Sequence, residues 1–159
     1  MGFIFDGKSI MRKFKIISTI LVLLFWVDMA VSAMTQVNID KTLEDYKWKN
    51  RLVFIFAPDG NNQKYQNIQA QLEKNKKDLT ERDIVVFKVF KDQVIYQNNQ
   101  LDKKAADDLR KRYSIDVSDF NLVLVGKDGT EKMKDNQANL SEIFPLIDSM
   151  PMRKNEVSQ

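Results

Sequence analysis

Two almost uninterrupted apolar runs constrain the fold of this 159-residue chain more than any other feature. They are RLVFIFA at residues 51–57 and NLVLVG at residues 121–126, and a third run, IVVFKVF, occupies residues 84–90. Alternating apolar and polar residues are typical of a strand with one face in water, whereas a continuous apolar run indicates a strand buried on both faces. A sheet built from such strands needs a layer of helices on each side.

Amphipathic segments can provide this cover. Apolar side chains recur at helical spacing in residues 61–79, 101–113 and 140–149. Pro145 is compatible with the last helix if Ser141 is its N-cap, because the proline then lies in the first turn, where few backbone hydrogen bonds are lost. A short helical turn with Thr42 as its N-cap is expected before the first strand.

The order of these elements predicts the fold class. Asp128-Gly129 is a strong turn signal, so residues 130–134 should fold back antiparallel on 121–126, and residues 93–96 add a short strand or hairpin. Right-handed crossover connections make the first two strands parallel. We therefore predict an α/β three-layer sandwich with a mixed central sheet and helices on both faces, which is the order of elements in thioredoxin-like proteins.

The N-terminal residues 1–33 are predicted to be a secretory signal peptide. Basic residues precede the apolar run 16–27, and Val31-Ser32-Ala33 offers the small residues of a cleavage site. The apolar run is short for a membrane-spanning helix, which needs about 20 residues. An uncleaved signal anchor and a start at Met11 remain as alternatives.

This prediction implies an exported protein, periplasmic or secreted, that contacts a membrane only if the signal segment is retained. The remaining chain divides into a lead-in with a short helix (34–50), a thioredoxin-like domain (51–150) and a C-terminal tail (151–159). Four of the 25 basic and two of the 22 acidic residues lie in the signal segment. The rest is nearly neutral, so we expect no nucleic-acid partner.

The composition also excludes a class of chemistry. The chain contains no cysteine and no histidine, so it has neither a thiol nucleophile nor the commonest general base and metal ligand. No glycine-rich phosphate loop and no clustered set of metal ligands is present in the sequence. We therefore expect no cofactor and no metal.

The absence of cysteine matters most at the end of the first strand. In thioredoxin-like enzymes a reactive cysteine caps the helix that follows this strand, and the helix N-terminus lowers its pKa. The corresponding residues here, which we call the redox position, include Asp59, Gly60 and Gln63. None of them can form a thiolate, and DVSDFN at 116–121 lacks the proline that such enzymes place before the later strand. Thiol–disulfide exchange and thiol peroxidase chemistry are excluded. Asp59 or Asn61 is expected to cap the helix, and an anion-binding site at this helix end is the alternative.

Several motifs carry a resemblance to a known family. They are YKWKNRLVFIFAP, ERDIVVFKV, LRKRYSI, FNLVLVGKDG and IDSMPMR, spread over residues 39–156. The chain resembles a thioredoxin-like, peroxiredoxin-like family of bacterial exported proteins with a domain of unknown function, and similar domains occur in vertebrate extracellular sushi-repeat proteins. The resemblance implies the fold and transfers no catalytic residue.

The predicted topology brings charged residues together at one pole of the sheet. They are Arg51, Arg82, Asp83, Lys127, Asp128 and Arg153, with Asp148 nearby. One interpretation is a structural ion-pair network that fastens the turn to the chain end, with Met150 and Met152 packed beneath it. The other is a binding site for a carboxylate, phosphate or sulfate group, since arginine recognises such groups through two parallel hydrogen bonds.

These observations lead to three functional hypotheses. The first is an exported non-redox domain that binds a protein or an anionic small molecule. The second is an enzyme that uses lysine, aspartate or arginine at the charged pole, which requires Lys127 or Asp83 to line a pocket. The third is a structural or envelope-stress protein that assembles through an apolar patch or a sheet edge.

Overall fold

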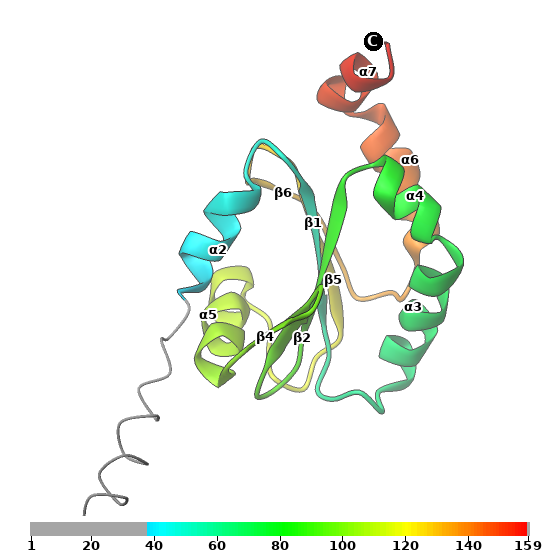
Figure 1. Ribbon diagram of the computed structural model, residues 1–159. Helices are drawn as coiled ribbons and strands as arrows, with labels where there is room; N and C mark the ends of the chain where they lie inside the picture. Colours follow the sequence, from blue (N-terminus) through cyan, green and yellow to red (C-terminus); the bar gives the residue numbers. More distant parts are fainter. Residues whose placement is uncertain (1–37, 159) are drawn as a thin grey trace, which may run out of the picture. The chain divides into compact units, whose positions relative to one another are not determined.

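The computed structural model of the protein describes residues 38–158, which form one unit around a six-stranded sheet (Figure 1). The strands are β1 (Arg51–Phe56), β2 (Ile84–Val89), β3 (Val94–Tyr96), β4 (Asn99–Leu101), β5 (Asn121–Val125) and β6 (Glu131–Asp135). The helices are α2 (Ile39–Tyr46), α3 (Gln63–Lys74), α4 (Lys76–Glu81), α5 (Lys103–Tyr113), the 3-10 turn η1 (Leu140–Glu142), α6 (Ile143–Ser149) and α7 (Pro151–Val157).

The sheet is mixed, as the sequence predicts. Its strand order is β4-β3-β2-β1-β5-β6, with β1 parallel to β2 and antiparallel to β5. The short strands β3 and β4 form a hairpin beside β2, and β6 returns antiparallel to β5. Every residue of β1 is buried, which explains its uninterrupted apolar sequence.

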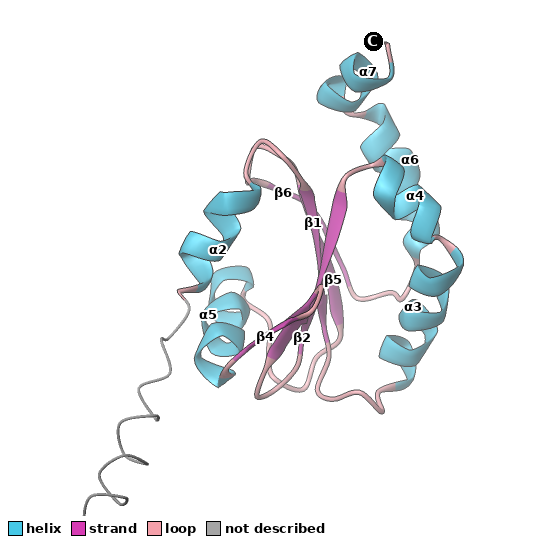
Figure 2. Cartoon of the chain, viewed as in Figure 1, coloured by secondary structure: helices cyan, strands magenta, loops and turns pink. Residues whose placement is uncertain are grey.

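Helices cover both faces of the sheet, so the predicted three-layer architecture is confirmed. Helices α2 and α5 lie on one side, and α3, α4 and α6 lie on the other (Figure 2). Successive side chains of β1 alternate between the two cores. Phe54 and Phe56 pack in the core beneath α2 and α5, whereas Val53 and Ile55 pack in the core with Ile68 of α3.

The helix predicted for residues 61–79 is two helices, α3 and α4. Asn75 ends the first with a non-helical backbone, and its side-chain amide donates to the carbonyl of Gln71 at 2.7 Å. Asparagine side chains compete in this way with the backbone hydrogen bonds of a helix. The start was also misplaced, because Asn62 caps α3 through hydrogen bonds from Lys64 N and Tyr65 N.

Three other boundaries differ from the prediction because a different polar residue caps the helix. Leu101 ends strand β4 rather than starting a helix, and Asp102 caps α5 by accepting from Ala105 N. Asn38 rather than Thr42 caps α2. Asn139, not Ser141, caps the turn η1 that leads into α6.

The C-terminal segment contains a helix that the sequence analysis did not anticipate. Helix α7 starts at Pro151, a residue that suits the first position of a helix because its missing N–H has no partner there. The predicted signal peptide lies outside the described residues. Among the helices of residues 38–158, none combines the length and the apolarity that crossing a bilayer requires.

Candidate functional site

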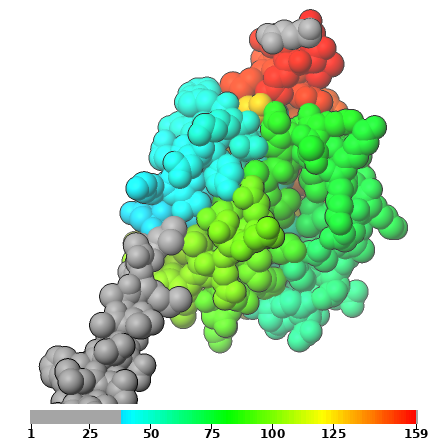
Figure 3. Space-filling model, viewed as in Figure 1, coloured from blue at the N-terminus to red at the C-terminus, as the bar shows by residue number. Residues whose placement is uncertain are grey.

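The charged pole is assembled from four parts of the chain that the topology brings together. Arg51 begins β1, Arg82 and Asp83 join α4 to β2, Lys127 lies in the turn after β5, and Arg153 lies on α7. In Figure 3 this turn is a yellow patch between the cyan N-terminal part and the orange and red C-terminal helices. The predicted convergence of these segments is therefore found in the structure.

Glu156, which the sequence analysis did not select, is the centre of the charged pole. Its carboxylate accepts hydrogen bonds from both terminal nitrogens of Arg51 at 3.1–3.2 Å. Arg51 is only 1% exposed, and it also donates to the carbonyl of Arg82 at 3.0 Å. A guanidinium buried this deeply needs a carboxylate partner, and the last helix supplies it.

Lys127 connects this pair to the start of β2. Its ammonium nitrogen lies 2.8 Å from Asp83 Oδ2 and 2.8 Å from Glu156 Oε1. Burial tends to lower the pKa of Lys127, but the hydrogen bonds to Asp83 and Glu156 outweigh burial and raise it. Burial likewise tends to raise the pKa of Glu156, and the hydrogen bonds from Lys127 and Arg51 lower it below its ordinary value. Both shifts in pKa favour the charged forms of Lys127 and Glu156.

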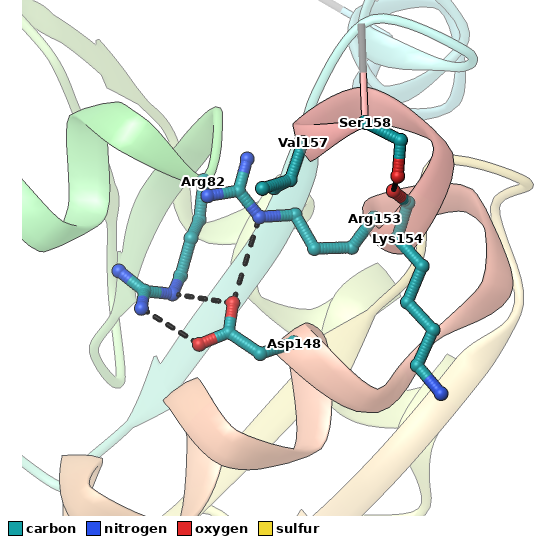
Figure 4. Close-up of a pocket in the computed structure, with 6 residues that line it drawn as sticks. All are labelled: Arg82, Asp148, Arg153, Lys154, Val157 and Ser158. Carbon is teal, nitrogen blue, oxygen red and sulfur yellow. Dashed lines mark hydrogen bonds and ion pairs between the residues drawn. The ribbon is translucent and has the colours of Figure 1, made fainter.

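A second group of ion pairs joins α4, α6 and α7 (Figure 4). Arg82 binds Asp148 through two nitrogens, at 3.0 and 2.7 Å, and binds Asp78 through the third at 3.1 Å. The hydrogen bond from Arg82 is the main reason why the pKa of Asp148 lies below its usual value. Arg153 donates to the carbonyl of Glu81 at 2.9 Å, and its Nε lies 3.5 Å from Asp148.

Two predicted members of the pole lie elsewhere. Asp128 pairs with Lys132 at 2.7 Å and accepts from Thr130, so it stabilises its own turn and does not join the network. Met152 is exposed on α7 rather than packed beneath the pole, although Met150 is partly buried against the core. Asp128 pairs with residues of its own turn because these contacts do not require a second segment of the chain to be fixed in place.

An open hollow of about 570 Å³ lies beside this network. Arg82, Asp148, Arg153, Lys154 and Val157 line it (Figure 4). Neither Lys127 nor Asp83 is among its lining residues. Asp148 already occupies the paired donors of Arg82, so an added anion would have to displace this carboxylate to bind that guanidinium. The geometry therefore favours the structural interpretation, in which the pole fastens α7 to the sheet.

The redox position lies at the opposite end of β1. Asn62 caps α3, and Asp59 accepts from the backbone N–H of Asn61 at 2.7 Å. The prediction that Asp59 or Asn61 caps this helix is therefore wrong: Asp59 forms only a local turn, and the cap Asn62 lies between Asn61 and Gln63. Because side-chain oxygens already accept from these backbone N–H groups, the helix end offers few free donors to an anion.

A second hollow, of about 450 Å³, opens at this end, and we call it the polar cleft. It is lined by Asn62, Gln63, Lys64, Ser118, Asp119, Phe120, Asn121 and Asn136. The lining comes from the start of α3, the loop before β5 and the segment after β6. In the described part of the chain, the side chains of Gln63, Asp119 and Asn121 make no hydrogen bond or ion pair. These three side chains of the cleft are therefore available to a ligand, in contrast to the paired groups of the charged pole.

Arg110 supports this end of the sheet from within, and no sequence signal distinguished it from its basic neighbours. It is 5% exposed and donates to the carbonyls of Ala57, Val89 and Asp116 at 2.7–3.3 Å. Burial lowers the pKa of Arg110, against the opposing effect of Asp116 and other carboxylates. Its contacts tie the ends of β1 and β2 to the loop that lines the polar cleft.

The residues 38–158 hold no cluster of three or more His, Cys, Asp or Glu side chains that could bind a metal ion. The fold and this cysteine-free site together define a thioredoxin-like α/β domain. Its backbone is similar to solved structures of two Plasmodium proteins. The reduced 2-Cys peroxiredoxin of Plasmodium vivax gives a TM-score of 0.52 at 16% identity, covering 71% of this chain and 84% of that one. Thioredoxin peroxidase I of Plasmodium yoelii gives 0.54 at 18% identity, covering 71% and 79%.

The chain belongs to the family described as Domain of unknown function (DUF4174), whose model matches residues 42–156. It is 28% identical over 122 residues to Sushi repeat-containing protein SRPX2 of Xenopus laevis, and 24% identical over 139 residues to Coiled-coil domain-containing protein 80 of Danio rerio. These matches cover 74% and 76% of this chain but only 27% and 16% of the relatives. The similarity is thus to one part of much longer proteins.

Proposed function

We propose that this protein is an exported, non-redox thioredoxin-like domain that binds a ligand in the polar cleft. The observation that carries the proposal is a cleft kept open at the redox position of a chain without cysteine. The volume is within the range of about 300–1,000 Å³ that is usual for ligand sites. Asn62 serves as a helix cap where a redox enzyme needs a thiolate, so the cleft can bind but cannot exchange electrons through sulfur.

The charged pole has a different role in this proposal. Three of its cations, Arg51, Arg82 and Lys127, bind carboxylates of the same chain at 2.7–3.1 Å. The fourth, Arg153, lies 3.5 Å from Asp148 and 3.7 Å from Glu156. A catalytic lysine is typically depressed in pKa and exposed to a pocket, whereas the pKa of Lys127 is raised and its side chain is largely buried. The pole therefore supports the C-terminal helix instead of acting on a substrate.

Two measurements test the proposed function. Peroxide consumption and insulin reduction by the purified protein should stay at the level of buffer, and measurable turnover would refute the non-redox role. A fragment-library screen followed by nuclear magnetic resonance should then give saturable shifts at residues 62–64 and 118–121. Asn121→Ala should weaken these hits, whereas Gln100→Ala on the exposed strand β4 should not.

Export is a separate part of the proposal and rests on the N-terminal sequence. Expression of the full chain with a C-terminal tag should yield an extracytoplasmic protein whose N-terminus follows Ala33. A full-length product retained in the cytoplasm contradicts export, and a full-length product in the membrane fraction supports the uncleaved anchor.

A further inference from the structure

We infer that the polar cleft takes an uncharged, hydroxyl-rich ligand of saccharide chemistry. This inference rests on the proposed function and names the class of ligand that the cleft would bind. It is carried by the kind of side chains that line the cleft and by the groups that remain unpaired there.

The charges of the cleft disfavour an ionic ligand. Lys64 and Asp119 are its only charged lining residues, and they balance. The ammonium of Lys64 already donates to the carbonyl of Asn136 at 3.0 Å and lies 5.9 Å from the ring of Phe120. Asp119 has no ion-pair partner in the described residues, so its carboxylate repels an anion. A cation would find this single carboxylate and no second one among the lining residues.

An apolar ligand is also disfavoured. Phe120 is the only apolar side chain in the lining, and it is 6% exposed. An apolar group placed here would remove the amides of Gln63 and Asn121 from water without giving them a hydrogen-bond partner. Each buried polar group left in this way costs about 1–3 kcal/mol.

The backbone of the cleft disfavours an extended peptide that binds by strand addition. Asn121 starts β5, which lies between β1 and β6, and it pairs with Phe56 of β1. From Leu122 on, β5 is paired on both sides, so an extended peptide would find no row of unpaired N–H and C=O groups along this strand.

The unpaired side chains of the cleft are suited to hydrogen bonds with hydroxyl groups. An amide side chain offers two donors and an acceptor, and a carboxylate accepts from up to two hydroxyls. Gln63 reaches the cleft from α3, whereas Asp119 and Asn121 reach it from the loop and strand opposite. A ring with neighbouring hydroxyl groups, each both donor and acceptor, can satisfy all three unpaired side chains at once.

The test is a titration of the full chain with neutral disaccharides, using cellobiose, maltose and N,N′-diacetylchitobiose. At least one of them should bind saturably, with amide shifts concentrated at residues 62–64 and 118–121. Gln63→Ala and Asp119→Asn should each weaken binding about tenfold or more, because the first removes a direct hydrogen bond and the second replaces a charged acceptor with a neutral, weaker one. Gln100→Ala should leave binding unchanged. Gln63 is exposed, so its variant should fold and keep the test valid even if Asp119→Asn is destabilised.

Titrations with other ligands distinguish a wrong class of ligand from the absence of any binding in the cleft. Inorganic phosphate and a Gly-Ser tetrapeptide are titrated in parallel. If either binds in the cleft and no disaccharide does, the class of ligand is wrong and the binding role stands. If the disaccharides, phosphate, the tetrapeptide and the fragment library all give no shifts at the cleft, both the inference and the proposed function fail. Disaccharide binding that Gln63→Ala and Asp119→Asn leave unchanged also overturns the inference.

Discussion

Replacing Glu156 tests whether the charged pole fastens the last helix to the sheet. Glu156→Gln keeps the size of the side chain but removes its charge and turns one acceptor oxygen into a donor. Arg51, at 1% exposure, then loses its carboxylate and faces an amide that repels some of its N–H groups. Lys127 loses one of its two carboxylate partners but keeps Asp83.

The magnitude follows from the burial of the partners. Removing one member of a fully buried ion pair costs about 3–5 kcal/mol. Glu156 is 24% exposed and some water reaches its carboxylate, so we expect a loss of about 2–3 kcal/mol in the free energy of unfolding. For a domain of this size that loss corresponds to a fall of about 6–15 °C in the melting temperature.

Urea denaturation followed by circular dichroism measures this free energy, and amide hydrogen exchange shows where the loss occurs. Helix α7 has no fully buried residue, so its amides at 154–157 should exchange faster in the variant, while those of β1 keep their order of protection. Glu73→Gln is the matched control, because Glu73 forms an exposed pair with Lys76 and its replacement should leave the free energy of unfolding almost unchanged.

The reasoning is refuted if Glu156→Gln unfolds with the same free energy as Glu73→Gln. It is also refuted if the protein loses 2–3 kcal/mol while the exchange of α7 is unchanged, since the loss would then have another origin. A double-mutant cycle with Arg51→Met provides a further check, because the two substitutions should be clearly non-additive.

Four other predictions follow from single residues. Arg110→Met should cost about 2–4 kcal/mol in urea denaturation, because it leaves three carbonyl acceptors at the end of the sheet without their donor. Asn62→Ala should cost about 1 kcal/mol in the same assay by removing the cap of α3. Ser114→Gly should raise the melting temperature slightly, with a gain of roughly 0.5–1 kcal/mol, because Ser114 has a left-handed backbone with φ of 51°. The stability difference between wild type and Glu156→Gln should shrink in denaturation at pH 3 compared with pH 6. The folded pKa of Glu156 is lowered, so its contribution is present above the ordinary value of about 4.5 and is lost as the pH falls through the folded value.

The sequence predicted the sheet and its covering layers because burial leaves a strong pattern. β1 is buried on both faces and is apolar at five of its six positions, from Leu52 to Phe56. The Asp128-Gly129 turn likewise predicted the return of β6 along β5. Helix boundaries were predicted less well, since several polar residues compete for each cap and only the packed structure selects one. Asn62 and Asn139 became caps although Asn61 and Ser141 were available in the sequence.

The candidate site likewise contains residues whose positions the sequence predicted and residues whose positions it did not. Strand direction was enough to predict that Arg51, Arg82 and Lys127 converge, because it fixes which loops share an end of the sheet. It was not enough to predict Glu156, whose position depends on a break at Met150 and a second helix beyond it. The prediction that Asp128 joins the network was wrong, because its contacts are with residues of its own turn and strand topology does not determine them.

The two ends of the sheet differ in what their polar groups are free to do, and this difference decides where a function is sought. At the charged pole Arg51, Arg82 and Lys127 bind carboxylates of the same chain, so an anion that binds these groups must first displace an existing partner. In the polar cleft the side chains of Gln63, Asp119 and Asn121 are paired with no other side chain or backbone group in residues 38–158, and a ligand there has only water to displace. Binding to water-exposed groups costs less than breaking a charged network. The many charged residues that the sequence places at the pole bind one another and leave few groups free for a ligand. The unpaired side chains of Gln63, Asp119 and Asn121 mark the end of the sheet that can accept one.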